Sequence, residues 1–201
     1  MHYTLYEHVH IKYSLTKTID GVSMPKQIEN VQKRTLEAAK CELLESGYSG
    51  FTIRSVAKKC GIAVGTIYNY FPSKDILAAS VMLNDWNDAL LVMRQASKTS
   101  ETITEGLHVI YKEIEKFSSL YRKIWAQYSL TGDFTTDYSK RHNLLITQLS
   151  EIIHALLERF HTAEDEFLDN FVAENLLNAA MRKSNFHSLA AIFERIFNSK
   201  R

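Results

Sequence analysis

The sequence is poor in the residues that make tight turns. It holds only 7 Gly and 2 Pro among 201 residues, whereas these two residue types together usually reach about 12% of a chain. Sandwiches, barrels and doubly wound sheets need frequent turns, and Gly and Pro are the residues that form most of them. Their scarcity argues against a β-rich or α/β fold and predicts an all-α protein.

Cysteine and long apolar runs are scarce as well. Cys41 and Cys60 are too few for a disulfide framework or a four-cysteine zinc site, and we interpret them as reduced, buried thiols. The longest uncharged run, Cys60–Ser73, has fourteen residues, fewer than the roughly 17 that a membrane span needs. The first residues show no basic leader followed by an apolar stretch. We therefore expect a cytoplasmic protein without a membrane segment.

An excess of one charge is absent from the whole chain but not from its parts. The 24 Lys+Arg nearly balance the 23 Asp+Glu, and the net charge is +1. Residues 25–75 carry 8 basic and 5 acidic side chains, whereas residues 76–201 carry 14 and 16. A basic N-terminal module on an otherwise balanced chain is typical of phosphate binding.

The motifs of common enzyme classes are missing. The sequence contains no G-x-S-x-G, P-loop, G-x-G-x-x-G or H-E-x-x-H. His8 and His10 are too few ligands for more than weak metal binding. We expect no catalytic residue, no metal site and no cofactor, and hence a protein that is not an enzyme.

What the sequence does have is apolar residues at helical spacing from residue 25 onward. The pattern predicts helices over 25–46, 52–60, 64–70, from 74 onward, 103–117, 120–130 and 135–161, followed by two more. We expect Gly47 to end the first helix, Thr52 to cap the second and Ser100 to cap the helix at 103. Residues 1–23 are aperiodic, so they are either a flexible extension or lie ahead of a true start at Met24. The expected domains are 1–23, 24–76 and 77–201.

Residues 52–74 read as a helix-turn-helix motif. Gly61 lies between two short helices, where one residue must usually take a positive φ. The apolar Ile62 and Ile67 are placed to pack the two helices together. The second helix leaves small or hydrogen-bonding residues for its outer face, which suits the major groove of DNA: Val64, Gly65, Thr66, Tyr68 and Asn69.

The same region resembles the N-terminal module of TetR-type transcriptional regulators. The matching segments are TLEAA at 35–39, GY at 47–48, FTIR at 51–54, VA at 56–57, GI at 61–62 and GTIYNYFPSK at 65–74. Ala63 departs from the pattern because the family commonly has Ser there, and the change removes a helix cap. The resemblance covers about fifty residues; beyond them only length and helical character agree.

The resemblance assigns roles to residues of this module. It implies that Thr52 and Arg54 contact phosphates and that Tyr70 and Lys74 hold the backbone at the far end. Thr66, Tyr68 and Asn69 would face bases or nearby phosphates, and Phe71 would be buried. The full set of expected DNA-binding residues is Thr52, Arg54, Ala63, Val64, Gly65, Thr66, Tyr68, Asn69, Tyr70 and Lys74.

Two further sites are expected after residue 76. The middle of the chain is rich in aromatic residues that either form plain core or line an effector pocket, with Trp86, His108, Tyr111, Trp125 and Tyr128 as the candidates. The two closing helices carry wide apolar stripes that either pack internally or form a four-helix dimer interface. The interface candidates are Phe171, Leu176, Leu189, Phe193, Ile196 and Phe197.

Together these features predict a homodimeric protein that binds a palindromic double-stranded DNA operator, and the resemblance implies that it is a repressor. By the resemblance, a partly apolar small-molecule effector would release it. Two alternatives remain at this point. The first is a protein–protein adaptor of the same fold that has lost operator binding, and the second is a helical enzyme that modifies small molecules.

Overall fold

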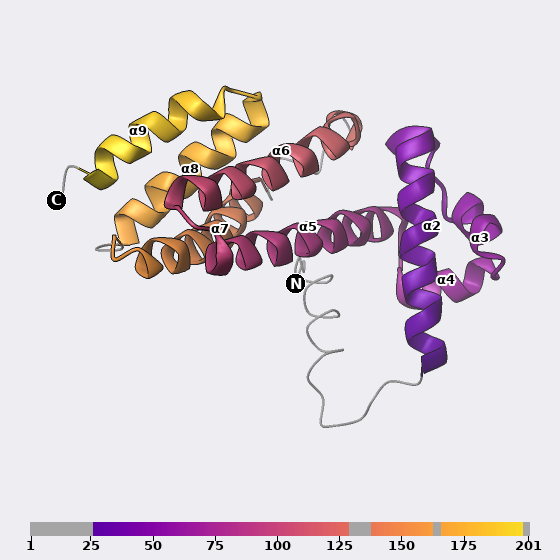
Figure 1. The fold of residues 1–201 in the computed structure, drawn as a ribbon. Helices are drawn as coiled ribbons and strands as arrows, with labels where there is room; N and C mark the ends of the chain where they lie inside the picture. Colours follow the sequence, from indigo (N-terminus) through magenta and orange to yellow (C-terminus); the bar gives the residue numbers. More distant parts are fainter. Residues whose placement is uncertain (1–25, 129–137, 163–165, 199–201) are drawn as a thin grey trace. The chain divides into compact units, whose positions relative to one another are not determined.

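The computed structural model describes residues 26–128, 138–162 and 166–198, and within these ranges the regular structure is entirely helical (Figure 1). The all-α prediction is confirmed. The expected extension at 1–23 and the alternative start at Met24 lie outside the described residues. The helices are α2 (Lys26–Gly50), α3 (Ile53–Cys60), α4 (Val64–Tyr70), α5 (Lys74–Thr99), α6 (Ile103–Tyr128), α7 (Tyr138–Arg159), α8 (Glu166–Arg182) and α9 (Phe186–Asn198).

The chain divides into two compact units. Of the described residues, unit 1 contains 26–85 and 123–128, and unit 2 contains 86–122, 138–162 and 166–198. Helices α5 and α6 therefore each contribute to both units. Unit 1 extends beyond the domain boundary expected after residue 76, because the next turns of α5 and the last turns of α6 pack with it.

In unit 1, the short helix α3 packs against the long helix α2, and α4 packs against α3 (Figure 1). The side chains that fill the space between them are fully or almost fully buried: Leu43, Phe51, Val56, Ile67, Phe71 and Leu77. The buried position of Phe71 agrees with expectation, as does that of Ile67. Gly47 has a φ of 65° and interrupts the helical conformation within α2. The sequence predicted this interruption, because glycine adopts a positive φ more readily than other residues.

In unit 2, α7 packs along α8, and α8 packs against α9. Their apolar faces join those of α5 and α6 in one core that includes Leu90, Ile110 and Val172. Gly106 marks a close approach between helices, because a Cβ there would lie 2.7 Å from both Cδ atoms of Leu156. A larger residue at 106 would therefore have to displace the side chains of Leu156 and Ser100.

Two expectations about α6 are wrong. The helix runs without a break from Ile103 to Tyr128, so there is no separate segment at 120–130. Ser100 does not cap it, because its hydroxyl donates to the carbonyl of Ala96 at 2.7 Å. Thr102 is the cap instead, since its Oγ1 accepts from the backbone N of Glu105 at 3.1 Å.

Helix α5 is long and apolar enough to cross a membrane by length and composition alone, although no uncharged run of that length occurs in the sequence. Its apolar side chains are placed in the two cores instead: Leu77 and Val81 in unit 1, and Leu90 and Met93 in unit 2. Burial of this kind is what a core helix of a globular protein shows.

The cysteine prediction holds for only one residue. Cys60 is buried, but Cys41 is exposed. Cys60 ends α3, and its Sγ lies 3.5 Å from the carbonyl oxygen of Arg34 on α2. The guanidinium of Arg34 in turn donates to the carbonyl of Cys60 at 2.7 Å. Burial raises the pKa of the Cys60 thiol, so this thiol contributes to packing rather than to reactivity.

Candidate nucleic-acid interface

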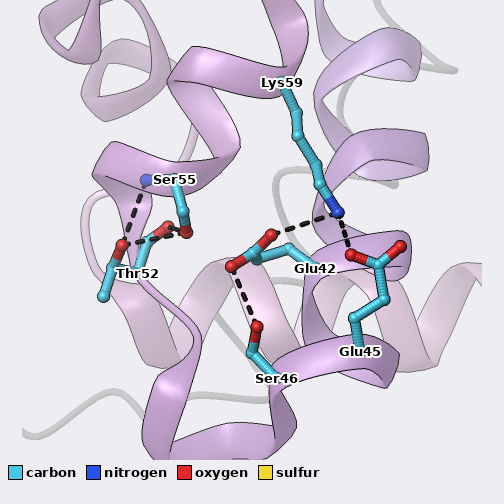
Figure 2. Close-up of polar contacts among 6 residues, drawn as sticks. All are labelled: Glu42, Glu45, Ser46, Thr52, Ser55 and Lys59. Atoms are coloured by element: carbon cyan, nitrogen blue, oxygen red, sulfur yellow. Dashed lines mark hydrogen bonds and ion pairs between the residues drawn. The ribbon is translucent and has the colours of Figure 1, made fainter.

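Helix α3 begins with a side-chain cap. The backbone of Thr52 is extended, and its Oγ1 accepts a hydrogen bond from the backbone N of Ser55 at 3.0 Å (Figure 2). Such a cap satisfies a backbone N–H that the helix itself leaves unpaired. Thr52 and the neighbouring Arg54 are both exposed. The predicted cap is confirmed, and both side chains can be reached from solvent.

The turn between α3 and α4 depends on Gly61. This residue has a φ of 67° and a ψ of 33°, which is the left-handed conformation that glycine adopts at low cost. The next backbone N, that of Ile62, then donates to the carbonyl of Ala57 at 3.1 Å and closes the end of α3. The helix-turn-helix geometry expected from the sequence is therefore present.

Ala63 is the N-cap residue of helix α4 and makes no side-chain cap hydrogen bond, as expected for Ala in place of Ser. Ile67 points inward and is fully buried, whereas Tyr68 is 49% exposed. Gly65 and Asn69 are exposed too, and Val64, Thr66 and Tyr70 are half-buried. A Cβ added to Gly65 would meet no atom within 4 Å. The fold therefore does not require a glycine here, and the outer face of α4 is open to a partner.

Lys74 and Tyr48 form a contact that the sequence analysis missed. The Nζ of Lys74, the first residue of α5, lies 4.4 Å from the centroid of the Tyr48 ring. The hydroxyl of the same tyrosine donates to the carboxylate of Asp75. The only sequence signal was the Gly47-Tyr48 pair, which carried the family resemblance without a role of its own.

A second missed residue is Gln127 in the last turn of α6. Its Oε1 accepts a hydrogen bond from the backbone N of Tyr48 at 2.7 Å. The backbone N of Ser49 lies 3.4 Å from the same oxygen. The amide thus caps the turn at the end of α2. Nothing local to Gln127 in the sequence pointed to this contact.

Part of the basic charge of the module is neutralised inside it. Lys59 of α3 forms ion pairs with both Glu42 and Glu45 of α2 (Figure 2). Lys40 Nζ lies 2.7 Å from Asp85 Oδ2. Hydrogen bonding to Lys59 lowers the pKa of Glu42. In contrast, Arg54 and Lys58 make no ion pair among the residues that the structure describes. These two exposed cations are available for phosphate.

The predicted effector residues do not form one site within either unit. Trp86, His108 and Tyr111 belong to unit 2, whereas Trp125 belongs to unit 1. Tyr128 ends α6, and its side chain lies outside the described part. The polar atoms of two candidates are already used: Trp86 Nε1 donates to Gln148 at 2.8 Å, and the Tyr111 hydroxyl donates to the carbonyl of Ser184 at 2.6 Å.

Unit 2 also has an open cavity away from these aromatic residues. Its volume is about 340 Å³, and it lies where the α5–α6 connection meets the ends of α7 and α9. Residues that line it include Glu101, Phe160, Glu194 and Phe197. None of the five predicted effector residues is among its lining residues.

Most of the predicted dimer residues are needed by the core of a single chain. Leu176 and Phe193 are buried, and Leu189, Ile196 and Phe197 pack against the same core. Leu176 and Phe193 are thus buried within one chain, and their assignment to a dimer interface stays a prediction. Phe171 remains 37% exposed. Exposed apolar side chains that the prediction missed are Phe167 and Met181 on α8 and Ile192 on α9.

Comparison with known proteins agrees with this geometry. Residues 36–81 match the sequence profile described as "Bacterial regulatory proteins, tetR family". The regulator UidR of Escherichia coli K12 is 28% identical over 115 residues, which are 57% of this chain and 55% of UidR. The repressor KstR of Rhodococcus jostii is 37% identical over 67 residues, which are 33% of this chain and 31% of KstR. The chain thus matches little more than half the length of UidR and less of KstR.

Solved structures extend the similarity in fold. A TetR-family transcriptional regulator from Pectobacterium atrosepticum is 18% identical, covers 87% of this chain and 95% of its own, and superposes with a TM-score of 0.56. At this identity the likeness concerns the fold alone. The profile match lies on the helix-turn-helix that the geometry defines, so this module of the chain is similar to the N-terminal module of the tetR family of bacterial regulatory proteins.

Proposed function

We propose that the protein is a transcriptional regulator that binds double-stranded DNA through α4. The observation that carries the proposal is the outer face of α4, where Tyr68 and Asn69 are exposed and a Cβ at Gly65 would meet no atom within 4 Å. Arg54 supplies a positive charge at the start of α3, and Lys74 supplies one just beyond α4. Small and hydrogen-bonding side chains flanked by cations suit a major groove and its phosphates.

The regulator acts as a homodimeric repressor on a palindromic operator. The name of KstR supports repression, because that relative is a transcriptional repressor. One short recognition helix contacts only a few bases, and a two-fold dimer doubles the contacts on two half-sites. The exposed apolar residues of α8 and α9 support the dimer: Phe167, Phe171, Met181 and Ile192.

A partly apolar small molecule bound in unit 2 releases the repressor from DNA in the cytoplasm. Helix α5 begins at Lys74 in unit 1 and ends in unit 2, so a displacement of its unit 2 part reaches the DNA-binding module. Recognition helices of a dimer must lie about 34–36 Å apart, or a multiple of this, to enter successive major grooves. An effector near Trp86 and Tyr111 must displace side chains that are now hydrogen-bonded, and it would change that separation.

Selection of DNA with the purified full-length protein tests the proposal. Several rounds of binding to a random duplex library should enrich a palindromic sequence with two half-sites. Asn69→Asp, which places a negative charge on the outer face of α4, should abolish the enrichment. Asn87→Asp is the matched control, because Asn87 is an exposed asparagine on a helix of unit 2, and it should enrich the same sequence.

Absence of enrichment with the wild-type protein at low salt would contradict the proposal and favour the adaptor. Equal enrichment by Asn69→Asp would show that another surface contacts DNA.

A further inference from the structure

We propose that Tyr48 is a positioning residue for DNA binding: its ring holds the ammonium group of Lys74 in place for a DNA phosphate while leaving the charge available. The inference rests on the proposed function, because it assigns a role within the same DNA-binding surface. It concerns unit 1 alone, to which Tyr48, Lys74, Asp75 and Gln127 all belong.

The contact between the ring and the ammonium group is close. Lys74 Nζ lies 4.4 Å from the centroid of the Tyr48 ring, within the roughly 6 Å over which a cation is attracted to an aromatic face. A lysine side chain has four flexible carbon–carbon bonds, and ordering it on binding costs entropy. A ring that already confines the ammonium group reduces that cost when a phosphate arrives.

Confinement by a ring differs from confinement by a carboxylate. Lys59 lies between Glu42 and Glu45, so its charge is neutralised within the module. Lys74 makes no ion pair with any residue in the described ranges. The ring therefore orients the cation without cancelling its charge, which is the condition that a sequence-independent phosphate contact requires.

Tyr48 also binds the acidic neighbour of Lys74. The Tyr48 hydroxyl donates to Asp75 Oδ1, so one phenol contacts both of the first two residues of α5. The carboxylate of Asp75 is thereby held at the hydroxyl end of the phenol. The ammonium group of Lys74 lies over the ring face instead.

The backbone of Tyr48 is fixed from the other side. Its N–H donates to Gln127 Oε1 at 2.7 Å, and it follows Gly47, whose φ is 65°. A Cβ at Gly47 would lie only 2.9 Å from the same Gln127 oxygen. Glycine at 47 thus permits both the turn and the approach of Gln127. The turn and the hydrogen bond to Gln127 together fix the position of the Tyr48 ring against Lys74.

A double-mutant cycle tests the proposal by DNA affinity. The probe is a labelled duplex carrying the sequence recovered by selection, with a scrambled duplex of equal length, each titrated over a range of salt. Tyr48→Leu should weaken binding to both duplexes about 2- to 5-fold. Lys74→Ala should reduce the salt slope by about one, and adding Tyr48→Leu to it should cause no further loss.

Two variants serve as controls for the cycle. Tyr48→Phe keeps the ring without the hydroxyl, so it should restore most of the affinity lost in Tyr48→Leu. In an Arg54→Ala background, Tyr48→Leu should still cause its full loss, because Arg54 does not lie over this ring. An equal loss from Tyr48→Leu in the Lys74→Ala and Arg54→Ala backgrounds would overturn the proposal. So would a Tyr48→Phe protein as weak as Tyr48→Leu.

Tyr48 is buried, so the leucine variant can lose stability. Circular dichroism and thermal melting of each variant check this, and Tyr48→Met is the substitute if the leucine variant unfolds. In the free wild-type protein, NMR should show the Lys74 Hε resonances shifted upfield by the ring. Ordinary Hε shifts would overturn the inference, whereas shifted resonances in a protein that binds no duplex would contradict only the proposed function.

Discussion

The ammonium group of Lys59 lies 3.1 Å from Oε2 of Glu42, so a cation of α3 is paired with a nearly buried carboxylate of α2. The other carboxylate oxygen of Glu42 accepts from the hydroxyl of Ser46 at 3.1 Å. These hydrogen bonds lower the pKa of Glu42, with the bond from Lys59 as the largest cause. Hydrogen bonding to Glu45 is the main cause that raises the pKa of Lys59.

The stability of unit 1 should fall in acid because of Glu42. Its folded pKa lies below the ordinary value of 4.5, so its contribution is complete above about 4.5 and is lost as the pH falls through the folded pKa. The folded pKa of Lys59 lies above 10.5. The contribution of Lys59 to stability is therefore lost only as the pH rises through that folded pKa. Glu42→Gln should therefore lower stability at neutral pH and make the acid loss shallower.

Urea denaturation at a series of pH values measures this effect. Glu37→Gln is the matched control, because Glu37 is an exposed carboxylate on the same helix. If the free energy of unfolding falls equally steeply with decreasing pH in the wild type and in Glu42→Gln, the acid loss does not come from Glu42.

Gly65→Ala should separate folding from DNA binding. The new Cβ meets no atom of the chain within 4 Å, and alanine in a helix is favoured over glycine by about 0.5–1 kcal/mol. The variant should be slightly more stable in urea denaturation yet bind the selected duplex more weakly, because the methyl group enters the space of the DNA. Undiminished affinity would show that DNA does not approach this position.

Gly61→Ala is the contrasting variant for the same measurement. Space is also open around Gly61, but its φ is 67°, and an L-residue in the left-handed region costs about 1–2 kcal/mol. This variant should be less stable than the wild type.

Ala63→Ser should restore the missing cap of α4. Ala63 already has the extended backbone of an N-cap, with a φ of −67° and a ψ of 143°. A serine hydroxyl there can accept from a backbone N–H in the first turn, which is worth about 0.5–2 kcal/mol. Thermal melting should show a higher midpoint than the wild type. Ala63→Val, which adds volume without a hydroxyl, should not raise it.

Charge on the exposed face of α8 and α9 should break the dimer. Ile192 is 51% exposed and Phe171 is 37% exposed, so Phe171→Glu and Ile192→Glu each place a carboxylate in the proposed apolar interface without disturbing the core. Light scattering should show the mass of one chain in place of two. Leu91→Glu, at an exposed leucine of α5, should leave the dimer intact. A wild-type protein with the mass of one chain would exclude the dimer itself.

The helices and the helix-turn-helix could be predicted from the amino-acid pattern alone. Apolar residues three and four positions apart predict a helix without reference to the rest of the chain. Ile67 and Phe71 are therefore buried as expected. Gly61 and Thr52 also act locally, one through its positive φ and the other through a bond to a residue three positions on. Such features are encoded within one or two turns.

The partner that each side chain contacts, in contrast, depends on how the helices pack. Tyr48 and Gln127 are 79 residues apart, and no local pattern links them. Whether Lys59 or Lys74 keeps its charge available depends on the surface packed against each of them, two carboxylates for one and a ring for the other. Likewise, an apolar stripe does not reveal whether Leu176 or Phe171 faces the core, because burial depends on which neighbouring helices cover each side of α8.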